Sequence, residues 1–266
     1  MSPLHDLLAC PADLEPLQHD VEGASCPACG RRFPLVEGIL CLLPDQLCAR
    51  QSADAAWQAK QSEQSARDAQ ADDYDRMLGL RLLTAWERPA VLRRLHLQPG
   101  QVVLEAGCGT GRITAALARR SRVVALDFSL ESLRRNRHKL AAAGIEALLV
   151  QADLNHVPLR PQSVDAVVSC QVLEHLPGEE ARTRAVAELA RVLRPGGRLA
   201  ISAYHYNLAT RWFGAQEGQH PGGIYYHRFT RREYRELLEK CFTLDSVSAV
   251  GGYVLLAAGR KPEVVP

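Results

Sequence analysis

Short apolar runs alternate with amphipathic stretches along the second half of the chain. Runs of four to eight apolar residues are typical of buried strands, and the spacing from Val186 to Leu193 is typical of a helix with one buried face. Strands alternating with helices form a mainly parallel sheet covered on both faces, so the pattern predicts an α/β fold. Strands are expected at 102–106, 122–127, 146–150, 164–169, 198–202, 242–248 and 252–258, with helices near 111–120, 130–143, 186–193 and 230–240.

Short polar motifs predict where several of these helices begin and end. The Ser129 hydroxyl can accept the first free backbone N–H groups of the helix at 130–143. Thr230 and Glu233 have the spacing of a capping box, in which each side chain bonds the other residue's backbone. The Pro-Gly-Gly run at 195–197 stops the helix before it.

Composition divides the 266 residues into three segments, a length that suits one α/β domain with a small extra module. Residues 1–44 hold short apolar runs among Cys, Pro and Gly. Residues 45–73 are rich in Gln, Ala, Ser and Asp, which is typical of a linker or a solvated helix. Residues 74–266 carry the α/β pattern.

The charge and the hydropathy narrow the class of protein. The formal net charge is +2, which by itself does not indicate a nucleic-acid binder. No stretch approaches the roughly 20 apolar residues that are needed to cross a bilayer. The first residues lack the basic start and apolar core of a signal peptide. We therefore expect a cytoplasmic protein without a membrane partner.

The run Glu-Ala-Gly-Cys-Gly-Thr-Gly-Arg at 105–112 is the most informative motif in the chain. It follows a buried strand and precedes a helix, and glycines at such a turn let the backbone approach a ligand closely. The glycines alternate at Gly107, Gly109 and Gly111, unlike the G-x-G-x-x-G spacing of dinucleotide-binding turns. The motif therefore predicts a ligand loop that differs from those of nicotinamide-dependent enzymes.

Polar residues stand at the ends of the following strands too. Asp127 ends the second strand, Asp153 follows the third, and Gln171 follows the fourth. In an open α/β sheet these strand ends converge on one crevice, where a carboxylate can hold ribose hydroxyls. The order of the motifs predicts a site for a nucleotide-type ligand, although Asp127 could instead only cap the next helix.

These motifs, over about residues 74–260, resemble the nucleotide-binding core of class I S-adenosylmethionine-dependent methyltransferases. The resemblance implies a Rossmann-like, seven-stranded, mainly parallel sheet with an antiparallel last strand, and S-adenosylmethionine as cofactor. It implies that Asp127 binds the ribose, that Phe128 packs on the adenine, and that the sulfonium lies near Cys170. The cofactor-binding residues that it implies are Tyr74, Glu105, Gly107, Cys108, Gly109, Gly111, Asp127, Phe128, Asp153, Leu154, Cys170 and Gln171.

The acceptor side of the pocket is predicted at the ends of the fourth and fifth strands, because the cofactor would occupy the glycine loop and the ends of the second and third strands. Methyl transfer is an in-line displacement, and a base is needed only where the acceptor must lose a proton. His175 stands in a Leu-Glu-His-Leu run that is usually structural in this family, so it is interpreted as structural. The candidate catalytic residues are Tyr204, His205 and His227, with Tyr206, Tyr225 and Tyr226 beside them in the acceptor pocket. The alternative is that these aromatic residues only pack the segment 203–229 against the sheet.

The N-terminal segment resembles a small zinc ribbon of the kind that activates translation-related methyltransferases. Cys26 and Cys29 form one C-x-x-C pair, whereas the first pair is replaced by Cys10 and Asp13. Thiolates and a carboxylate can bind zinc tetrahedrally, and zinc can fold a module too small to be stable alone. We therefore predict one structural zinc on Cys10, Asp13, Cys26 and Cys29; the alternatives are Cys41 as the fourth ligand and a ribbon that has lost its metal.

The sequence therefore favours an enzyme that transfers a methyl group to a small organic acceptor. RNA base methylation is the first alternative, because the ribbon and the Arg groups at 134–139 and 231–235 would suit RNA. A cofactor-binding adaptor without activity is the second alternative. A nicotinamide-dependent oxidoreductase is disfavoured by the glycine spacing and by the closing hairpin. The sequence does not indicate an oligomeric state.

Overall fold

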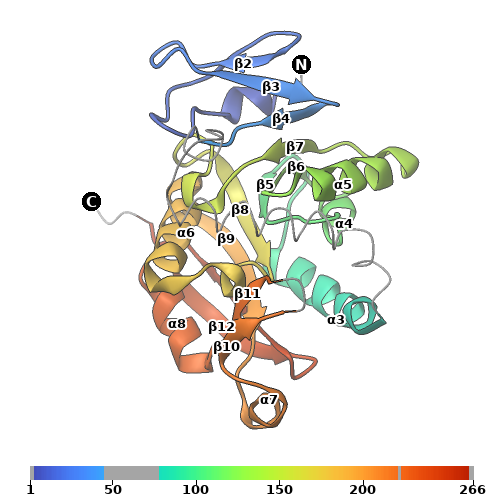
Figure 1. Ribbon diagram of the computed structural model, residues 1–266, viewed down its shortest axis with the longest axis vertical. Coiled ribbons are helices and arrows are strands. Elements are labelled where there is room, and N and C mark those ends of the chain that lie inside the picture. The colour runs from blue at the N-terminus through green and yellow to red at the C-terminus, as the bar shows by residue number, and fades with distance from the viewer. Residues whose placement is uncertain (1–2, 45–77, 221–222, 264–266) are drawn as a thin grey trace.

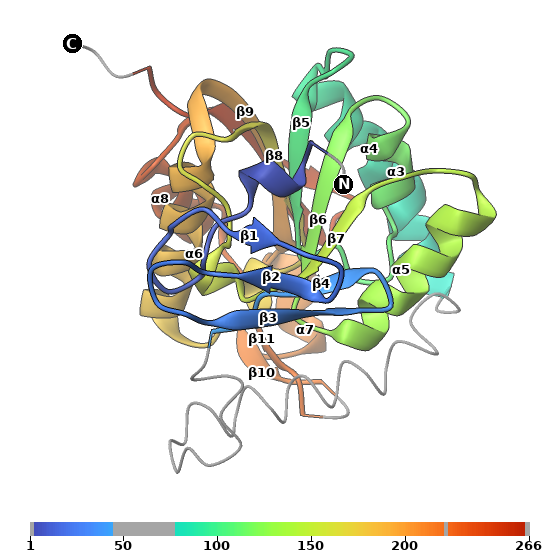
Figure 2. The same ribbon diagram turned by 90° about the horizontal axis from the view of Figure 1, so that it is seen from above.

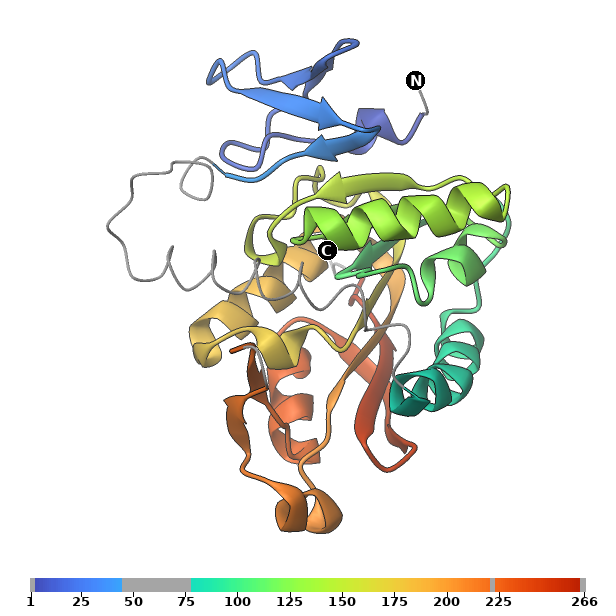
Figure 3. The same ribbon diagram turned by 45° about the vertical axis from the view of Figure 1, so that its right-hand side comes forward.

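The computed structural model describes residues 3–44, 78–220 and 223–263 (Figure 1). The expected linker at 45–73 and the candidate cofactor residue Tyr74 therefore lie outside the described residues. One mixed sheet of eleven strands runs through the described part of the chain, and helices lie on both of its faces (Figures 1 and 3). This is the α/β fold that the alternating pattern predicts.

Seven strands form the part of the sheet that the resemblance implies. Their order is β7-β6-β5-β8-β9-β13-β12. The first five are parallel, and β13 runs antiparallel to both β9 and β12, which confirms the expected closing hairpin. The strands are β5 (Val102–Ala106), β6 (Arg122–Asp127), β7 (Leu148–Gln151), β8 (Val164–Cys170), β9 (Leu193–Tyr204), β12 (Thr243–Val250) and β13 (Val254–Arg260). The strand order reverses between β5 and β8, where a ligand crevice is expected.

Two apolar cores lie between the sheet and the helices, one on each face of the sheet. The helices α3 (Leu78–Leu95), α4 (Thr114–Ala118) and α5 (Leu130–Ala142) pack on one face, and α6 (Gly178–Val192) and α8 (Arg231–Glu239) on the other. The predicted caps are confirmed: Ser129 Oγ accepts from Ser132 N at 3.0 Å, and Thr230 and Glu233 form a capping box. The helix α4 is shorter than predicted, because residues 111–113 complete the glycine turn before it begins.

The N-terminal module adds four strands to the same sheet, which the sequence did not predict. It contains η1 (His5–Leu7), β1 (Gln18–His19), β2 (Gly23–Ser25), β3 (Arg32–Val36) and β4 (Ile39–Cys41). The strand β4 pairs in parallel with β7, with Leu40 opposite Val150 (Figure 2). Phe33 and Leu42 of the module share an apolar core with the α/β domain. The module therefore covers the β7 edge, which would otherwise expose unpaired backbone groups.

Part of the basic group at 134–139 helps to hold this module in place. Arg134 and Arg137 of α5 both pair with Glu37, which lies in the turn between β3 and β4, at 3.0 and 3.2 Å. The Lys139 ammonium donates to the Thr110 carbonyl at 2.8 Å and so ties α5 to the glycine loop. These cations therefore have carboxylate and carbonyl partners within the chain.

A second small sheet lies beyond the end of β9. The helix α7 (Leu208–Phe213) leads into the hairpin of β10 (Glu217–Gln219) and β11 (Tyr225–His227), which lies above α7 in Figure 1. No strand or helix was predicted for this segment from the sequence. Among the described residues, no helix combines the length and apolar character that a bilayer crossing requires.

Candidate functional site

The glycine loop is held against the end of β6 by backbone hydrogen bonds. Gly107 N and Cys108 N both donate to the Leu126 carbonyl at 2.8 Å. All three glycines have positive φ angles, which an L side chain rarely adopts. A Cβ atom at Gly107 would overlap Val172, and one at Gly111 would overlap the Asn136 amide, whereas Gly109 has open space before it. The loop therefore offers Gly109 to a ligand and uses the other two for packing.

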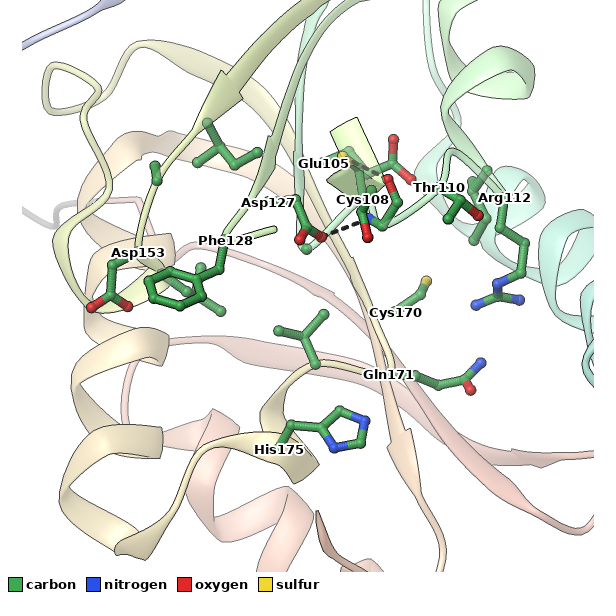
Figure 4. Close-up of a pocket in the computed structure, with 18 of the residues that line it drawn as sticks. Glu105, Cys108, Thr110, Arg112, Asp127, Phe128, Asp153, Cys170, Gln171 and His175 are labelled. Atoms are coloured by element: carbon green, nitrogen blue, oxygen red, sulfur yellow. Dashed lines mark hydrogen bonds between the residues drawn. The ribbon is translucent and has the colours of Figure 1, made fainter. Parts of the chain in front are cut away.

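One pocket opens beside this loop, at the carboxyl ends of β5, β6, β7 and β8 (Figure 4). Every described residue that was predicted to bind cofactor lines it, except Gly111. The residues that line it are Glu105, Gly107, Cys108, Gly109, Thr110, Arg112, Ile113, Leu126, Asp127, Phe128, Ser132, Ala152, Asp153, Leu154, Cys170, Gln171, Val172, His175 and Leu176. The pocket thus lies where the strand order reverses, as expected of a ligand site in an open α/β sheet.

The Asp127 carboxylate binds backbone groups of the glycine loop and of the turn that follows β6. It accepts from Gly109 N at 2.7 Å and from Ser129 N at 2.9 Å. Each carboxylate oxygen can accept about two hydrogen bonds, so a carboxylate at this place is able to bind hydroxyl groups. The N-cap of α5 is Ser129, so Asp127 fixes the turn before the helix and does not cap it, and it also lines the pocket.

Glu105 is the most unusual carboxyl group in the pocket. It is buried, and its Oε2 atom makes no hydrogen bond within the described residues. Burial raises the pKa of the Glu105 carboxyl to about 8, so the group is mainly protonated at pH 7. A buried carboxyl with an unpartnered oxygen at a pocket wall fits a cationic group of a ligand.

A buried glutamate of α3 binds two polar residues that line the pocket, Arg112 and Gln171. Glu87 is fully buried and accepts from Arg112 Nη1 at 2.5 Å, from Gln171 Nε2 at 2.9 Å, and from the Ser202 hydroxyl. Gln171 has a φ of 60°, an unusual backbone angle that this network holds in place. Glu87 was not predicted from the sequence, although it falls on the apolar side of α3 between Leu83 and Val91, where a charged residue is unexpected.

The structure does not bring the candidate catalytic histidines to the pocket wall. His205 lies beyond the end of β9, where its Nδ1 meets the Asn207 amide at 3.0 Å. His227 lies on β11, with its Nδ1 3.6 Å from a Glu217 carboxylate oxygen. Burial lowers the pKa of both imidazoles, so both are mainly neutral at pH 7. Neither residue lines the pocket, and Tyr204 does not line it either, although its ring contacts that of His175, which does.

His175 is the histidine that lines the pocket. It ends η3 (Leu173–His175), directly after β8, and it is 8% exposed. Its Nδ1 lies 2.8 Å from the Tyr225 carbonyl of β11. His175 was interpreted as structural from its Leu-Glu-His-Leu run, and the structure shows that its side chain also lines the pocket.

Four polar side chains come together at the tip of the N-terminal module. Ligand atoms of Cys10, Asp13, Cys26 and Cys29 all lie within 4.8 Å of one another. The Cys10 and Cys29 sulfurs are 3.7 Å apart, and Cys26 Sγ is 3.3 Å from an Asp13 oxygen. Tetrahedral zinc with bonds near 2.3 Å separates two sulfurs by about 3.8 Å, so the spacing fits zinc. Cys41 does not belong to the cluster; its Sγ lies 3.8 Å from the Ile39 carbonyl.

Comparison with known proteins identifies both parts of the chain. Residues 104–201 match the family described as methyltransferase domain, and residues 2–38 match the family described as Trm112p-like protein. The chain therefore contains a region similar to a methyltransferase domain, preceded by a region similar to Trm112p-like proteins. The first range contains all the residues that line the pocket, and the second contains the whole four-residue cluster.

Two curated relatives differ in what their names say of the acceptor. A probable tRNA methyltransferase 9B from Mus musculus is 37% identical over 136 residues, which are 50% of this chain and 28% of that protein. A demethylmenaquinone methyltransferase from Thermobifida fusca is 35% identical over 144 residues, covering 52% of this chain and 59% of that protein. The chain therefore spans less than two thirds of either relative.

Solved structures with the same fold are less similar in sequence. A chain from a complex between the Haloferax volcanii Trm112 methyltransferase activator and a putative methyltransferase has a TM-score of 0.58 at 20% identity. The match covers 74% of this chain and 98% of that one. A methyltransferase from Methanosarcina mazei has a TM-score of 0.57 at 20% identity, covering 65% and 97%. These likenesses confirm the fold.

Proposed function

We propose that this protein is an S-adenosylmethionine-dependent methyltransferase that acts on a small organic acceptor. The observation that carries the proposal is the single pocket that gathers the glycine loop, Asp127, Asp153 and Gln171 from four strand ends. The match of residues 104–201 to a methyltransferase domain supports it. When bound, S-adenosylmethionine would supply an electrophilic methyl group on sulfur.

The pocket residues fit the parts of this cofactor by charge and position. Asp127 would accept hydrogen bonds from the ribose hydroxyls, and Phe128 and Asp153 would meet the adenine at the same side of the pocket (Figure 4). Glu105, with its unpartnered buried oxygen, would face the ammonium group of the methionine part. Arg112, fixed by Glu87, would face its carboxylate. The chain thereby positions the donor, which accounts for much of the acceleration in an in-line transfer.

The pairing of the basic residues favours a small acceptor over RNA. Arg135 pairs with Glu131 at 3.2 Å, and the exposed Arg232 and Arg235 of α8 pair with glutamates one turn later, both at 2.7 Å. Binding to RNA relies on cations that neutralise phosphates. Five of the arginines that suggested RNA, namely Arg134, Arg135, Arg137, Arg232 and Arg235, have carboxylate partners on their own helices or on the module, which leaves less positive charge for phosphates.

Two measurements test the proposed function. Titration calorimetry should show binding of S-adenosylmethionine and no binding of NAD. Incubation with methyl-labelled cofactor and a cell extract should then label small molecules. Label in RNA that disappears after ribonuclease treatment would favour the RNA alternative, and cofactor binding without any labelled product would favour the non-catalytic adaptor.

We propose further that Cys10, Asp13, Cys26 and Cys29 hold one structural zinc ion. The 3.7 Å sulfur spacing and the four-ligand set support this, as does the match to the Trm112-like family. The zinc would cross-link the two loops of a module whose apolar residues belong to a core shared with the α/β domain. The module would then act as a permanent extension of the sheet at β7.

Cofactor binding is expected to release a proton from Glu105. The pKa of this carboxyl is about 8 in the protein without ligand, and a bound ammonium group would stabilise the carboxylate and lower the pKa. At pH 7 the group therefore changes from mainly protonated to ionised on binding. The observed binding enthalpy should depend on the ionisation enthalpy of the buffer. Glu105→Gln should remove this dependence, whereas the exposed Glu146→Gln should keep it.

A further inference from the structure

Several large apolar side chains are exposed on three segments that follow one another across the surface. Leu82 and Trp86 lie on α3, Leu208 and Trp212 on α7, and Tyr253 in the turn between β12 and β13. Their exposed fractions range from 40% to 86%. Leu208 and Trp212 are four positions apart, so they share one face of α7. These five residues are called the apolar rim below.

The three segments of the apolar rim are in contact. A Cβ atom at Gly251 would lie 2.9 Å from the Trp86 ring, so this ring packs on the turn between β12 and β13. The Gly252 carbonyl accepts from Asn207 Nδ2 at 2.8 Å, and Asn207 is the N-cap of α7. In Figures 1 and 3 this turn, in red, lies between α3 and α7. The apolar rim is therefore one continuous surface, and such surfaces mark sites of interaction.

The apolar rim lies at the same edge of the sheet as the pocket. The first residue of β13 lies opposite Tyr204, the last residue of β9. The Tyr253 ring contacts the Tyr204 ring, with centroids 5.2 Å apart. Directly after Trp86 in α3 comes Glu87, the buried carboxylate that binds two residues of the pocket. Whatever binds the rim is therefore held beside the carboxyl ends of the strands.

The exposed charges of these segments are positive. Among the described side chains of α3, α7 and the turn, the charged residues that are exposed are Arg88, Arg93 and Arg211. None of the three pairs with a carboxylate within the described residues, and Arg211 lies over the Tyr206 ring, 5.0 Å from its centroid. The one acidic residue of these segments, Glu87, is fully buried. The rim thus combines apolar side chains with positive charge that the chain does not neutralise.

We propose that the apolar rim binds the surface of a bilayer that contains anionic lipid. Trp, Tyr and Leu side chains with arginines beside them are typical of proteins that lie at the boundary between lipid headgroups and acyl chains. The negative potential of anionic lipid attracts the arginines. The expectation of no membrane partner came from the lack of a spanning segment, and binding at the surface needs none. The proposal goes beyond the proposed function and does not depend on it.

Charge and shape favour lipid over a second copy of this chain. Two copies that met through the rim would bring their arginines together, and like charges across an interface oppose association. A protein partner would also need hollows that match side chains standing out from three segments. A lipid layer takes up such side chains between its headgroups and carries the opposite charge.

Sedimentation with vesicles tests the proposal on the full chain. The vesicles contain phosphatidylcholine alone, or phosphatidylcholine and phosphatidylglycerol in equal parts. The wild type should bind the second kind, and less so as salt rises, because salt screens the charged surface. Trp212→Glu and Trp86→Glu should each lower the partition coefficient by roughly tenfold. The matched control is Val21→Glu, which changes the charge equally on a residue that is 92% exposed in the N-terminal module, and it should bind as the wild type does.

Fluorescence shows whether the rim enters the lipid. The chain has three tryptophans, so Trp57→Phe leaves Trp86 and Trp212 as the emitting residues. Vesicles with brominated acyl chains should quench this emission, because bromine acts only at short range.

Several results would overturn the proposal. They are no binding to the anionic vesicles at low salt, equal binding by Trp212→Glu and Val21→Glu, and no quenching by the brominated lipid. A dimer in sedimentation velocity that Trp212→Glu abolishes would place a second copy on the rim instead. The melting temperature and the cofactor affinity of the variants should match those of the wild type. A parallel loss of either would mark the exchanged residues as structural and would also overturn the proposal.

Discussion

Replacing Asp127 by alanine is expected to raise the Kd for S-adenosylmethionine by roughly 10- to 150-fold. The carboxylate accepts from Gly109 N and Ser129 N, and it is proposed to accept from the ribose hydroxyls as well. Loss of a hydrogen bond to a charged acceptor costs about 1.5–3 kcal/mol, which corresponds to that range of affinity. Titration calorimetry at fixed salt and pH measures the change directly.

Two variants show whether the effect is local to the ribose position. Asp127→Asn keeps one acceptor oxygen and should lose less affinity than alanine does. Asp245→Asn, on β12 and outside the pocket, should bind the cofactor as the wild type does. If Asp127→Ala retains wild-type affinity, the proposed position of the ribose is wrong.

Replacing Cys26 by serine is expected to remove zinc and to destabilise the whole chain. Cys26 is buried, and its ligand atom belongs to the four-atom cluster. Structural zinc contributes about 10–16 kcal/mol to the folding of small zinc modules, so loss of one thiolate removes a large part of the stability of this one. Because Leu8, Phe33 and Leu42 share a core with the α/β domain, the melting temperature should fall by roughly 10 °C or more.

Cys41→Ser is the matched control, because Cys41 lies on β4 of the same module but outside the cluster. Elemental analysis of protein purified without chelator should find about one equivalent of zinc in the wild type and in this control. Full zinc content in Cys26→Ser, or less than about a tenth of an equivalent in the wild type, would contradict the proposed site.

Much of the α/β domain could be predicted because its signals are local. Two helix starts were predicted from capping residues, Ser129 for α5 and Thr230 with Glu233 for α8. Their hydrogen bonds join residues only three positions apart. The strands of the parallel sheet are continuous apolar runs, since both faces are buried. The position of the pocket could be predicted because the carboxyl ends of parallel strands converge. This convergence brings the glycine loop and Asp127 together.

The features that were missed depend on contacts between distant parts of the chain. The pairing of β4 with β7 joins residues more than a hundred positions apart, and no local pattern specifies it. The role of Glu87 depends on its hydrogen bonds with Arg112 and Gln171, which are distant from it in the sequence. His175 has an apolar local context, and its place at the pocket depends on the β10–β11 hairpin, which presents the Tyr225 carbonyl.

A crystal structure with S-adenosylhomocysteine bound tests the central claim most directly. The account predicts the ribose hydroxyls on Asp127, the adenine beside Phe128, the amino group at Glu105, and the sulfur near Cys170 and Gln171. A ligand bound elsewhere, or one whose ribose lies away from Asp127, would contradict the cofactor site assigned to this pocket.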